Sequence, residues 1–176
     1  MRLPLRTERL VLRAFVLADV DDVLAYQRLP EVARHMLWAP RDRRQVHDVV
    51  QQMARETTLD DDGDCLTLAV VANDTLVGQV ELVRHTPVRG ELGYVFNPEH
   101  HGHGFATEAA RAIVDHGFVL GLHTVIGRCA AANTASANLL RRLGMREQHR
   151  GRIHVKGAWR DELTFALSRP GMLLSG

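Results

Sequence analysis

The residues best suited to bind a ligand form a glycine-containing turn at 101–104, between an expected strand and an expected helix. Leu92 to Phe96 is rich in β-forming residues, and apolar residues recur with helical spacing from Ala106 to Phe118. Gly102 and Gly104 allow positive φ and the close approach of a ligand, and a helix start offers unpaired N–H groups at its positive end. The turn is therefore a candidate anion site, most naturally for phosphate, although such a glycine pair can also be a simple turn.

Two common classes of nucleotide site do not fit this turn. It lacks the Lys-Ser/Thr pair of nucleotide-hydrolysing phosphate loops, so it offers neither a phosphate-neutralising lysine nor a magnesium-binding hydroxyl. It also lacks the third glycine and the later acidic residue of a dinucleotide fold. The sequence therefore argues against ATP and NAD as ligands.

Two clusters could be read as metal sites. His100, His101 and His103 supply imidazoles, but no nearby cysteine or regularly spaced carboxylate completes a tetrahedral set. The acidic run Asp60 to Asp64 has Ala69 where a calcium loop would need glutamate. We expect no metal, a solvated acidic loop, and histidines that lie beside phosphate.

The composition restricts the class of protein. A chain of 176 residues predicts one domain, 1–176, and its net charge of +1 favours neither nucleic acid nor membrane as a partner. Charged residues interrupt the most apolar helix, and the charged N-terminus does not resemble a signal peptide. We therefore expect a cytoplasmic protein in which Cys65 and Cys129 are free, buried thiols.

The remaining elements must position this turn. The pattern predicts a strand at 7–13, a helix opened by Asp19, Asp21 and Asp22, and helices at 31–37 and 43–57. Strands follow at 66–72, 76–83, 91–96, 125–131, 145–155 and 159–167, with an Asn73-Asp74 turn. A further helix begins with Asn133 or Thr134 as its cap and ends at Gly144, and its leucines place Ser136 on the inward face. This order predicts a mixed α/β (α+β) fold with a mostly antiparallel sheet.

The motifs carry a family resemblance. Glu91-Leu92-Gly93-Tyr94, followed by Gly104-Phe105-Ala106-Thr107-Glu108-Ala109, resembles the acetyl-CoA-binding motif of the GNAT superfamily of N-acetyltransferases. The RimJ/RimL-like branch, which acetylates ribosomal-protein N-termini, is the more similar one. The resemblance extends to Thr7–Arg13, to Asn133–Asn138 with Leu143–Met145, and to Trp159–Glu162, so it covers almost the whole chain.

The resemblance implies a GNAT fold whose bent sheet is splayed between the fourth and fifth expected strands, at Glu91 and Val125. Acetyl-CoA, as co-substrate, would lie in that opening, with pantetheine beside the main chain of Val95 and Phe96. The resemblance places the pyrophosphate on the amides that follow His101, namely Gly102, His103, Gly104, Phe105, Ala106 and Thr107. The family usually has Gln or Arg where this chain has His101, so a side-chain contact to phosphate would become pH-sensitive.

For catalysis we expect an amine to attack the thioester directly in a ternary complex. Glu81 and Glu91, on neighbouring expected strands, are the candidate proton acceptors, although each could be an ordinary strand glutamate. By resemblance, Ser136 would protonate the departing thiolate, but it could be a plain helix-start serine. Asn133 and Asn138 could bind the cofactor, and Asn133 could equally be only a cap. Tyr94 is expected to serve packing.

The expected activity is transfer of an acetyl group from acetyl-CoA to a primary amine. A protein or peptide N-terminal α-amine is favoured, because its pKa of about 7.7–8.0 demands less of a base than a lysine at about 10.4. A small-molecule amine (an amino acid, a polyamine or an aminoglycoside) and a non-catalytic acyl-CoA-binding role remain open. Relatives of this type are often homodimers, and the sequence does not decide whether this chain is one.

Overall fold

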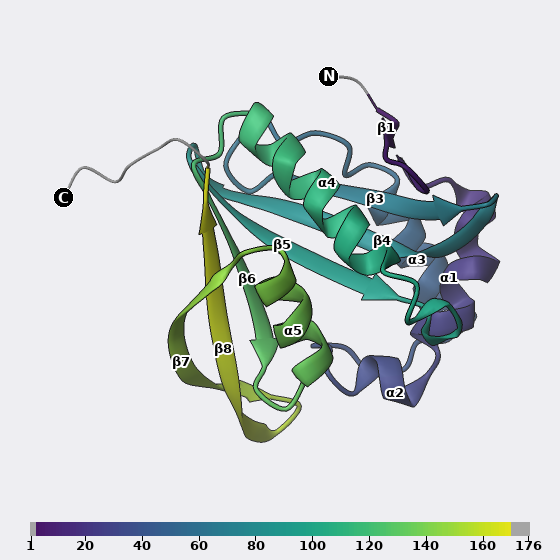
Figure 1. Cartoon of the computed structure of the whole chain (residues 1–176). Helices are drawn as coiled ribbons and strands as arrows, with labels where there is room; N and C mark the ends of the chain where they lie inside the picture. Colours follow the sequence, from purple (N-terminus) through teal and green to yellow (C-terminus); the bar gives the residue numbers. More distant parts are fainter. Residues whose placement is uncertain (1–2, 170–176) are drawn as a thin grey trace.

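Residues 3–169 are described by a computed structural model in which eight strands form one sheet, in the order β1-β2-β3-β4-β5-β6-β8-β7 (Figure 1). The strands are β1 Leu5–Arg6, β2 Val11–Arg13, β3 Cys65–Ala72, β4 Thr75–Thr86, β5 Arg89–Phe96, β6 Thr124–Ala130, β7 Arg146–Val155 and β8 Ala158–Ser168. The helices are α1 Val20–Gln27, α2 Pro30–Ala33, α3 Arg43–Met53, α4 Phe105–Val119 and α5 Thr134–Arg142, with 3₁₀ turns at Leu17–Asp19 and Pro98–His100. The two ends of the expected 1–176 domain lie outside the described residues.

The sheet is antiparallel except between β5 and β6, which run parallel and then separate. Arg89–Leu92 of β5 pairs with Thr124–Gly127 of β6. Residues 93–96 of β5 continue to pair with β4, and no pairing of them with β6 occurs within the described chain. The mixed, mostly antiparallel sheet and its opening between the strands of Glu91 and Val125 are therefore confirmed.

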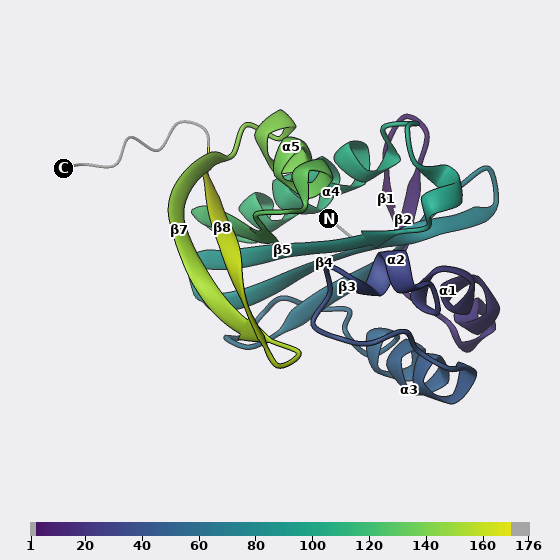
Figure 2. The same cartoon turned by 90° about the horizontal axis from the view of Figure 1, so that it is seen from below.

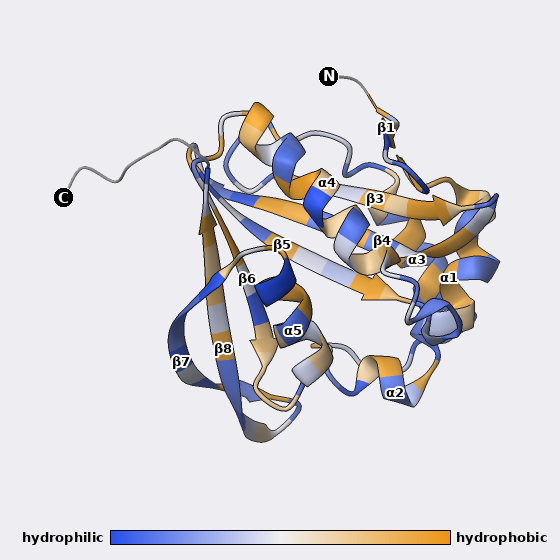
Figure 3. Cartoon of the chain, viewed as in Figure 1, coloured by the Kyte–Doolittle hydropathy of each residue, from blue (hydrophilic) through white to orange (hydrophobic). Residues whose placement is uncertain are grey.

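Helices cover both faces of this sheet. Figure 2 shows α4 and α5 on one face and α1, α2 and α3 on the other. Apolar side chains of the central strands pack on both sides, whereas the edge strand β7 is largely hydrophilic (Figure 3). The expected buried face of α4 is confirmed, since Ala109, Ala110, Ile113 and Val114 are all buried.

The expected hairpin turn and the expected cap of α5 are confirmed. Asn73 and Asp74 both have positive φ, at 47° and 62°, and join β3 to β4 as expected. Asn133, rather than Thr134, caps α5, because its side chain accepts a hydrogen bond from the amide of Ser136. Cys65 and Cys129 are free thiols as expected, and Cys129 is buried, but Cys65 is partly exposed rather than buried.

The expected strand over residues 7–13 is confirmed only at Val11–Arg13, because the chain turns at residues 7–10. The amide and hydroxyl of Thr7 bond the carbonyl and amide of Leu10, which leaves two short strands, β1 and β2, paired with each other. The alternating pattern of apolar residues matched a strand without revealing this turn.

The second and third helices end earlier than expected. Helix α2 stops at Ala33, and the carbonyls of Ala33 and Arg34 accept hydrogen bonds from Lys156 and Arg160 of the β7–β8 hairpin. Helix α3 stops at Met53, because the chain beyond it joins β3 through the carbonyl of Glu56, which accepts from the amide of Thr67. Within residues 3–169, no helix is long and apolar enough to cross a membrane.

Candidate functional site

The glycine turn has the backbone expected of an anion site. Gly102 and Gly104 have φ of 82° and 79°, in the left-handed region that glycine adopts without strain. Gly104 is the N-cap of α4, and because it has no side chain the cap adds no side-chain hydrogen bond. A side-chain Cβ at Gly102 would meet nothing within 4 Å, so the turn is open on that side. The first amides of α4 therefore remain available to a ligand.

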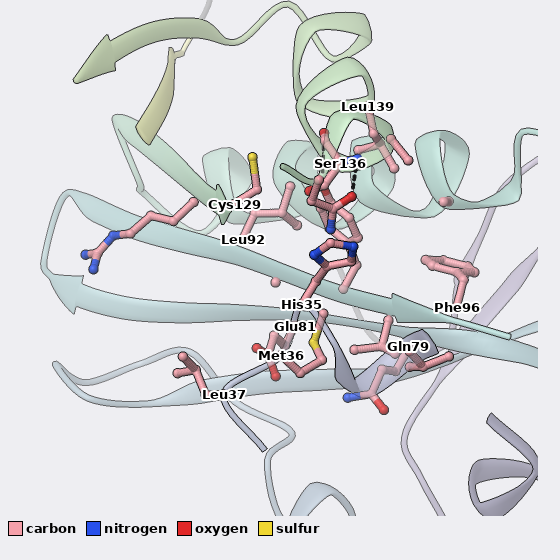
Figure 4. Close-up of a pocket in the computed structure, with 18 of the residues that line it drawn as sticks. His35, Met36, Leu37, Gln79, Glu81, Leu92, Phe96, Cys129, Ser136 and Leu139 are labelled. Atoms are coloured by element: carbon pink, nitrogen blue, oxygen red, sulfur yellow. Dashed lines mark hydrogen bonds between the residues drawn. The ribbon is translucent and has the colours of Figure 1, made fainter. Parts of the chain in front are cut away.

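A cavity of about 1500 Å³ opens where β5 and β6 part. The backbone of residues 93–96 lines it, as do His101, Gly102, Gly104 and the first turn of α4. Val95 and Phe96, expected beside pantetheine, are both in this wall. Loop 34–38, α3, β4, β6, α5 and the β7–β8 hairpin contribute further residues to the lining, part of which Figure 4 shows.

Arg142 of α5 lies beside the turn, and sequence reasoning missed it. Its Nε donates to Oγ1 of Thr107 at 3.4 Å, and both residues line the cavity. An arginine here would add a fixed positive charge next to the α4 amides. His101 is exposed at the cavity edge, whereas His103 stacks on Phe105 with ring centroids 5.4 Å apart.

Ser136 is held by hydrogen bonds in the first turn of α5. Its amide donates to Oδ1 of Asn133 at 3.1 Å, and its Oγ lies 2.6 Å from the hydroxyl of Tyr94 (Figure 4). Burial raises the pKa of Tyr94 to about 12, so its hydroxyl stays protonated at neutral pH. Tyr94, expected to serve packing, therefore also contacts the candidate acid.

Asn138 lies apart from this group. It is exposed, and its Oδ1 accepts a hydrogen bond from Arg141. Each residue turns an α-helix by about 100°, so Asn138 points away from the side that carries Ser136. The structure therefore brings Asn133 and Ser136 to the cavity and does not bring Asn138 there.

The two candidate bases have different surroundings. The carboxylate of Glu91 is engaged, with Oε2 lying 2.7 Å from Nε2 of His85 and 3.1 Å from Nη2 of Arg128. Glu81 also lines the cavity. Its pKa is shifted by burial and by nearby charges, and not by a hydrogen bond from another residue of the described chain. Burial raises the pKa of Glu81, and the carboxylates of Glu56 and Glu91 raise it further. Glu81 is therefore better suited to accept a proton.

Gly93 leaves the space that Glu81 occupies. The two residues face each other across the β4–β5 ladder. An ideal Cβ on Gly93 would lie 2.7 Å from Cγ and 2.8 Å from Cδ of Glu81, and closer still to its Oε1. Any larger residue at position 93 would therefore displace the Glu81 side chain.

Loop 34–38 and its neighbours form the rest of the wall, in the region around Trp38 where the family resemblance leads us to expect the acceptor to enter. Burial lowers the pKa of His35, and Arg34 and Arg160 lower it further, which favours a neutral imidazole. Arg41 stacks over Trp38, with its guanidinium 4.4 Å from the ring centroid, and donates to Gln27. Both side chains line the cavity. Only long-range packing brings this loop to the cavity, so the sequence held no local signal for it.

Potential metal ligands do not gather in the part of the chain that the structure describes. Among residues 3–169, no group of three His, Cys, Asp or Glu side chains could hold an ion. In the acidic loop, Asp64 instead accepts hydrogen bonds from the amides of Asp60 and Asp61. These bonds lower the pKa of Asp64, that from Asp61 most strongly.

Comparisons with known proteins agree with this architecture. Residues 9–146 match the acetyltransferase (GNAT) domain family. The uncharacterized N-acetyltransferase p20 of Bacillus licheniformis is 31% identical over 169 residues, which cover 93% of this chain and 94% of that protein. A GNAT-family acetyltransferase structure from Bacillus anthracis superposes with a TM-score of 0.84 and 26% identity, covering 93% of this chain and 96% of the other.

The structure of RimL, a ribosomal α-N-protein acetyltransferase in complex with coenzyme A, has a TM-score of 0.80. At 17% identity, over 94% of this chain and 97% of that one, this likeness concerns the fold alone. The family match and the p20 relative extend further, because each spans most of the chain. The chain belongs to the GNAT family of acetyltransferases.

Proposed function

We propose that this acetyltransferase binds acetyl-CoA in the cavity between β5 and β6 and transfers its acetyl group to a primary amine by direct attack in a ternary complex. The favoured acceptor is the α-amine of a protein or peptide N-terminus. We further propose that residues 1–176 form one domain that acts in the cytoplasm.

One observation carries this proposal. The turn at the start of α4, Ser136 and Glu81 all line the same cavity of about 1500 Å³. Phosphate would be held at one end by backbone amides, and proton-transfer groups lie along the same space. A domain that only binds acyl-CoA would have no need of the unpaired, partly buried carboxylate.

At the donor end, the amides of residues 102–107 would hold the pyrophosphate, with Arg142 adding charge beside Thr107. The cavity-lining backbone of Val95 and Phe96 would hold pantetheine. Because β6 does not pair with residues 93–96, the main-chain groups of these residues that face β6 can bond a ligand instead. The side-chain oxygen of Asn133 accepts the capping hydrogen bond of α5, so its NH₂ group is the part that would donate to the cofactor.

At the reacting end, the amine nitrogen bonds to the acetyl carbon and the carbon–sulfur bond breaks. Glu81 accepts the proton that the amine loses, directly or through water, because its raised pKa makes it a stronger base than an ordinary carboxylate. Ser136 gives its proton to the departing sulfur, and the hydroxyl of Tyr94, 2.6 Å away, can donate to the serine oxygen as it loses that proton.

The choice of acceptor rests on the strength of the base. A carboxylate, even with a raised pKa, suits an α-amine of pKa about 7.7–8.0 better than a lysine amine of about 10.4. The name of RimL, whose fold this chain shares, describes the same kind of acceptor. A small-molecule amine is the main alternative within the same chemistry.

Two measurements test the proposal. Acetyl-CoA should raise the melting temperature, since any ligand selective for the folded state does so, and Gly104→Glu should abolish the rise, because a residue with a side chain is strained at a φ of 79° and its carboxylate adds negative charge to the turn. Thiol release from acetyl-CoA should then be measured with peptides, amino acids, polyamines and aminoglycosides, and the fastest release is expected with peptides. No thermal shift at saturating acetyl-CoA would refute the donor site. A shift without release on any amine would leave only the binding role.

A further inference from the structure

The segment between β1 and β2 meets the first turn of α4 although about a hundred residues separate them. The hydroxyl of Thr7 donates to Oε1 of Glu108 at 2.6 Å, and the amide of Arg9 donates to the same oxygen at 3.0 Å. The guanidinium of Arg9 contacts the other carboxylate oxygen of Glu108, with Nε 2.8 Å and Nη2 2.6 Å from Oε2. Despite the opposing effect of partial burial, these bonds lower the pKa of Glu108 and keep it ionised.

Arg9 also reaches the glycine turn itself. Its Nη1 donates to the carbonyl of His103 at 2.9 Å, and its guanidinium lies 5.1 Å from the centroid of the Phe105 ring. Nη2 lies 3.4 Å from the point where a Cβ of Gly104 would stand. One side chain therefore ties the turn to the helix that follows it.

The hydrogen bond to His103 fixes a direction. In a planar trans peptide the carbonyl of His103 and the N–H of Gly104 point in opposite directions. Arg9 lies outside the large cavity, in a separate hollow of about 260 Å³, whereas Gly104 lines the large cavity. By holding the carbonyl on its own side, Arg9 turns the Gly104 N–H toward the side where phosphate would bind.

Among residues 3–169, no side-chain hydrogen bond caps the start of α4. The N-cap is a glycine, so α4 lacks the serine, threonine or aspartate that usually fixes a helix start. A capping side chain would also occupy the amides that a phosphate needs. Support from behind the turn leaves those amides open, which is what the Arg9 arrangement achieves.

We propose that Arg9 is a positioning residue for the phosphate-binding turn, held in place by Glu108 and Thr7. The inference rests on the proposed acetyl-CoA site. As an ion pair, Arg9 and Glu108 contribute little to stability, because the arginine is half exposed. Its role is to orient the amides of the turn, so its loss should weaken the binding of phosphate-bearing ligands in particular.

The test compares acetyl-CoA with S-acetyl-pantetheine, which lacks the phosphates and nucleotide. Dissociation constants are measured by calorimetric or thermal titration for the wild type, Arg9→Gln, Arg9→Lys and the control Arg6→Gln, an exposed arginine of the neighbouring strand. Arg9→Gln should weaken acetyl-CoA at least tenfold and leave S-acetyl-pantetheine within twofold. Arg9→Lys should recover part of the loss, and Arg6→Gln should match the wild type.

Other outcomes would overturn the inference in different ways. Equal affinity of wild type and Arg9→Gln for acetyl-CoA would refute the positioning role and leave the proposed function intact. Equal weakening of both ligands would show that Arg9 only supports the fold. A wild type that does not bind acetyl-CoA would refute the proposed function itself. If Arg9→Gln fails to fold, Glu108→Gln should show the same preference for S-acetyl-pantetheine to a smaller degree, and its absence there would refute the role.

Discussion

Replacing Gly93 by alanine should impair catalysis through the Glu81 side chain without unfolding the protein. The new Cβ would stand 2.7 Å from Cγ and 2.8 Å from Cδ of Glu81. Carbon atoms pack at about 3.5–4.0 Å, so the Glu81 side chain must move by about 1 Å or adopt another rotamer. The atoms that must move belong to a flexible side chain that faces a cavity, so the backbone need not shift.

The two effects of this substitution have different sizes. A misplacement of about 1 Å in a reacting group can cost about 100-fold in rate, so kcat should fall by about that factor. Stability should change little, because alanine in a strand interior is favoured over glycine by roughly 0.5–1 kcal/mol, which offsets part of the local strain. We expect the affinity for acetyl-CoA to stay near that of the wild type.

The assay is steady-state thiol release with the best acceptor, combined with thermal melting of each variant. A cycle with Glu81→Ala isolates the cause, because the short side chain removes the clash. In the Glu81→Ala background, adding Gly93→Ala should cost less than a further threefold in kcat. Turnover of Gly93→Ala within threefold of the wild type would refute the reasoning, as would an equal loss in both backgrounds.

Further expectations concern the proton-transfer groups and the phosphate end. Glu81→Gln should lower kcat/KM by about 100-fold. In a pH–rate profile, the wild type should lose activity toward low pH with a midpoint above the ordinary glutamate pKa, and Glu81→Gln should not show this loss. Because the folded-state pKa of Glu81 is raised, its contribution to stability is present at low pH and is lost as pH rises through that pKa. Glu81→Gln should therefore melt higher than the wild type at pH 8, and a lower melting temperature would contradict this. Ser136→Ala should lower kcat by roughly 100-fold with acetyl-CoA affinity nearly unchanged, and unchanged turnover would remove Ser136 from the mechanism. Arg142→Gln should weaken acetyl-CoA about fivefold to tenfold, as loss of one charge-assisted hydrogen bond would, in a titration where Arg146→Gln serves as the exposed control.

Local signals predicted much of the fold. The Asn73-Asp74 turn needed two positive φ values, which these residues tolerate, and the structure has them. The buried face of α4 followed from the spacing of its apolar residues. Each of these features depends on residues that are close together in the sequence.

Features that depend on distant partners were harder to predict. The contact between Tyr94 and Ser136 could not be predicted, because the two residues are 42 positions apart in the sequence. The turn at Thr7 was missed because one hydroxyl, bonded to Leu10 and Glu108, outweighs an alternating pattern typical of a strand. The early end of α2 depends on Lys156, more than a hundred residues later in the chain.

The two candidate bases show the limit of the sequence most clearly. Glu81 and Glu91 lie in neighbouring strands, and the alternation of side chains within each strand does not indicate which carboxylate is free to accept a proton. Both line the cavity, and their difference is three-dimensional: Glu91 lies against His85 and Arg128, whereas Glu81 lies against Gly93. Local sequence rules could not rank them.

The strand alternation also explains why the opening between β5 and β6 matters for the reaction. Glu81 is paired with Gly93 and lies two residues after Gln79, whose side chain bonds Tyr26 and Gln27 of α1, so Glu81 is on the face of the sheet that α1 and α3 cover. Tyr94, next to Gly93, is on the opposite face and contacts Ser136 of α5. In a closed sheet, backbone hydrogen bonds would separate a base on one face from an acid on the other. The stretch 93–96 has no β6 partner in the described chain, and the cavity there is lined by groups from both faces. In the proposed reaction, a substrate amine would meet Glu81 from one side while the sulfur of the donor would lie toward Ser136 on the other, and the parting of the strands from Gly93 onward would allow this arrangement.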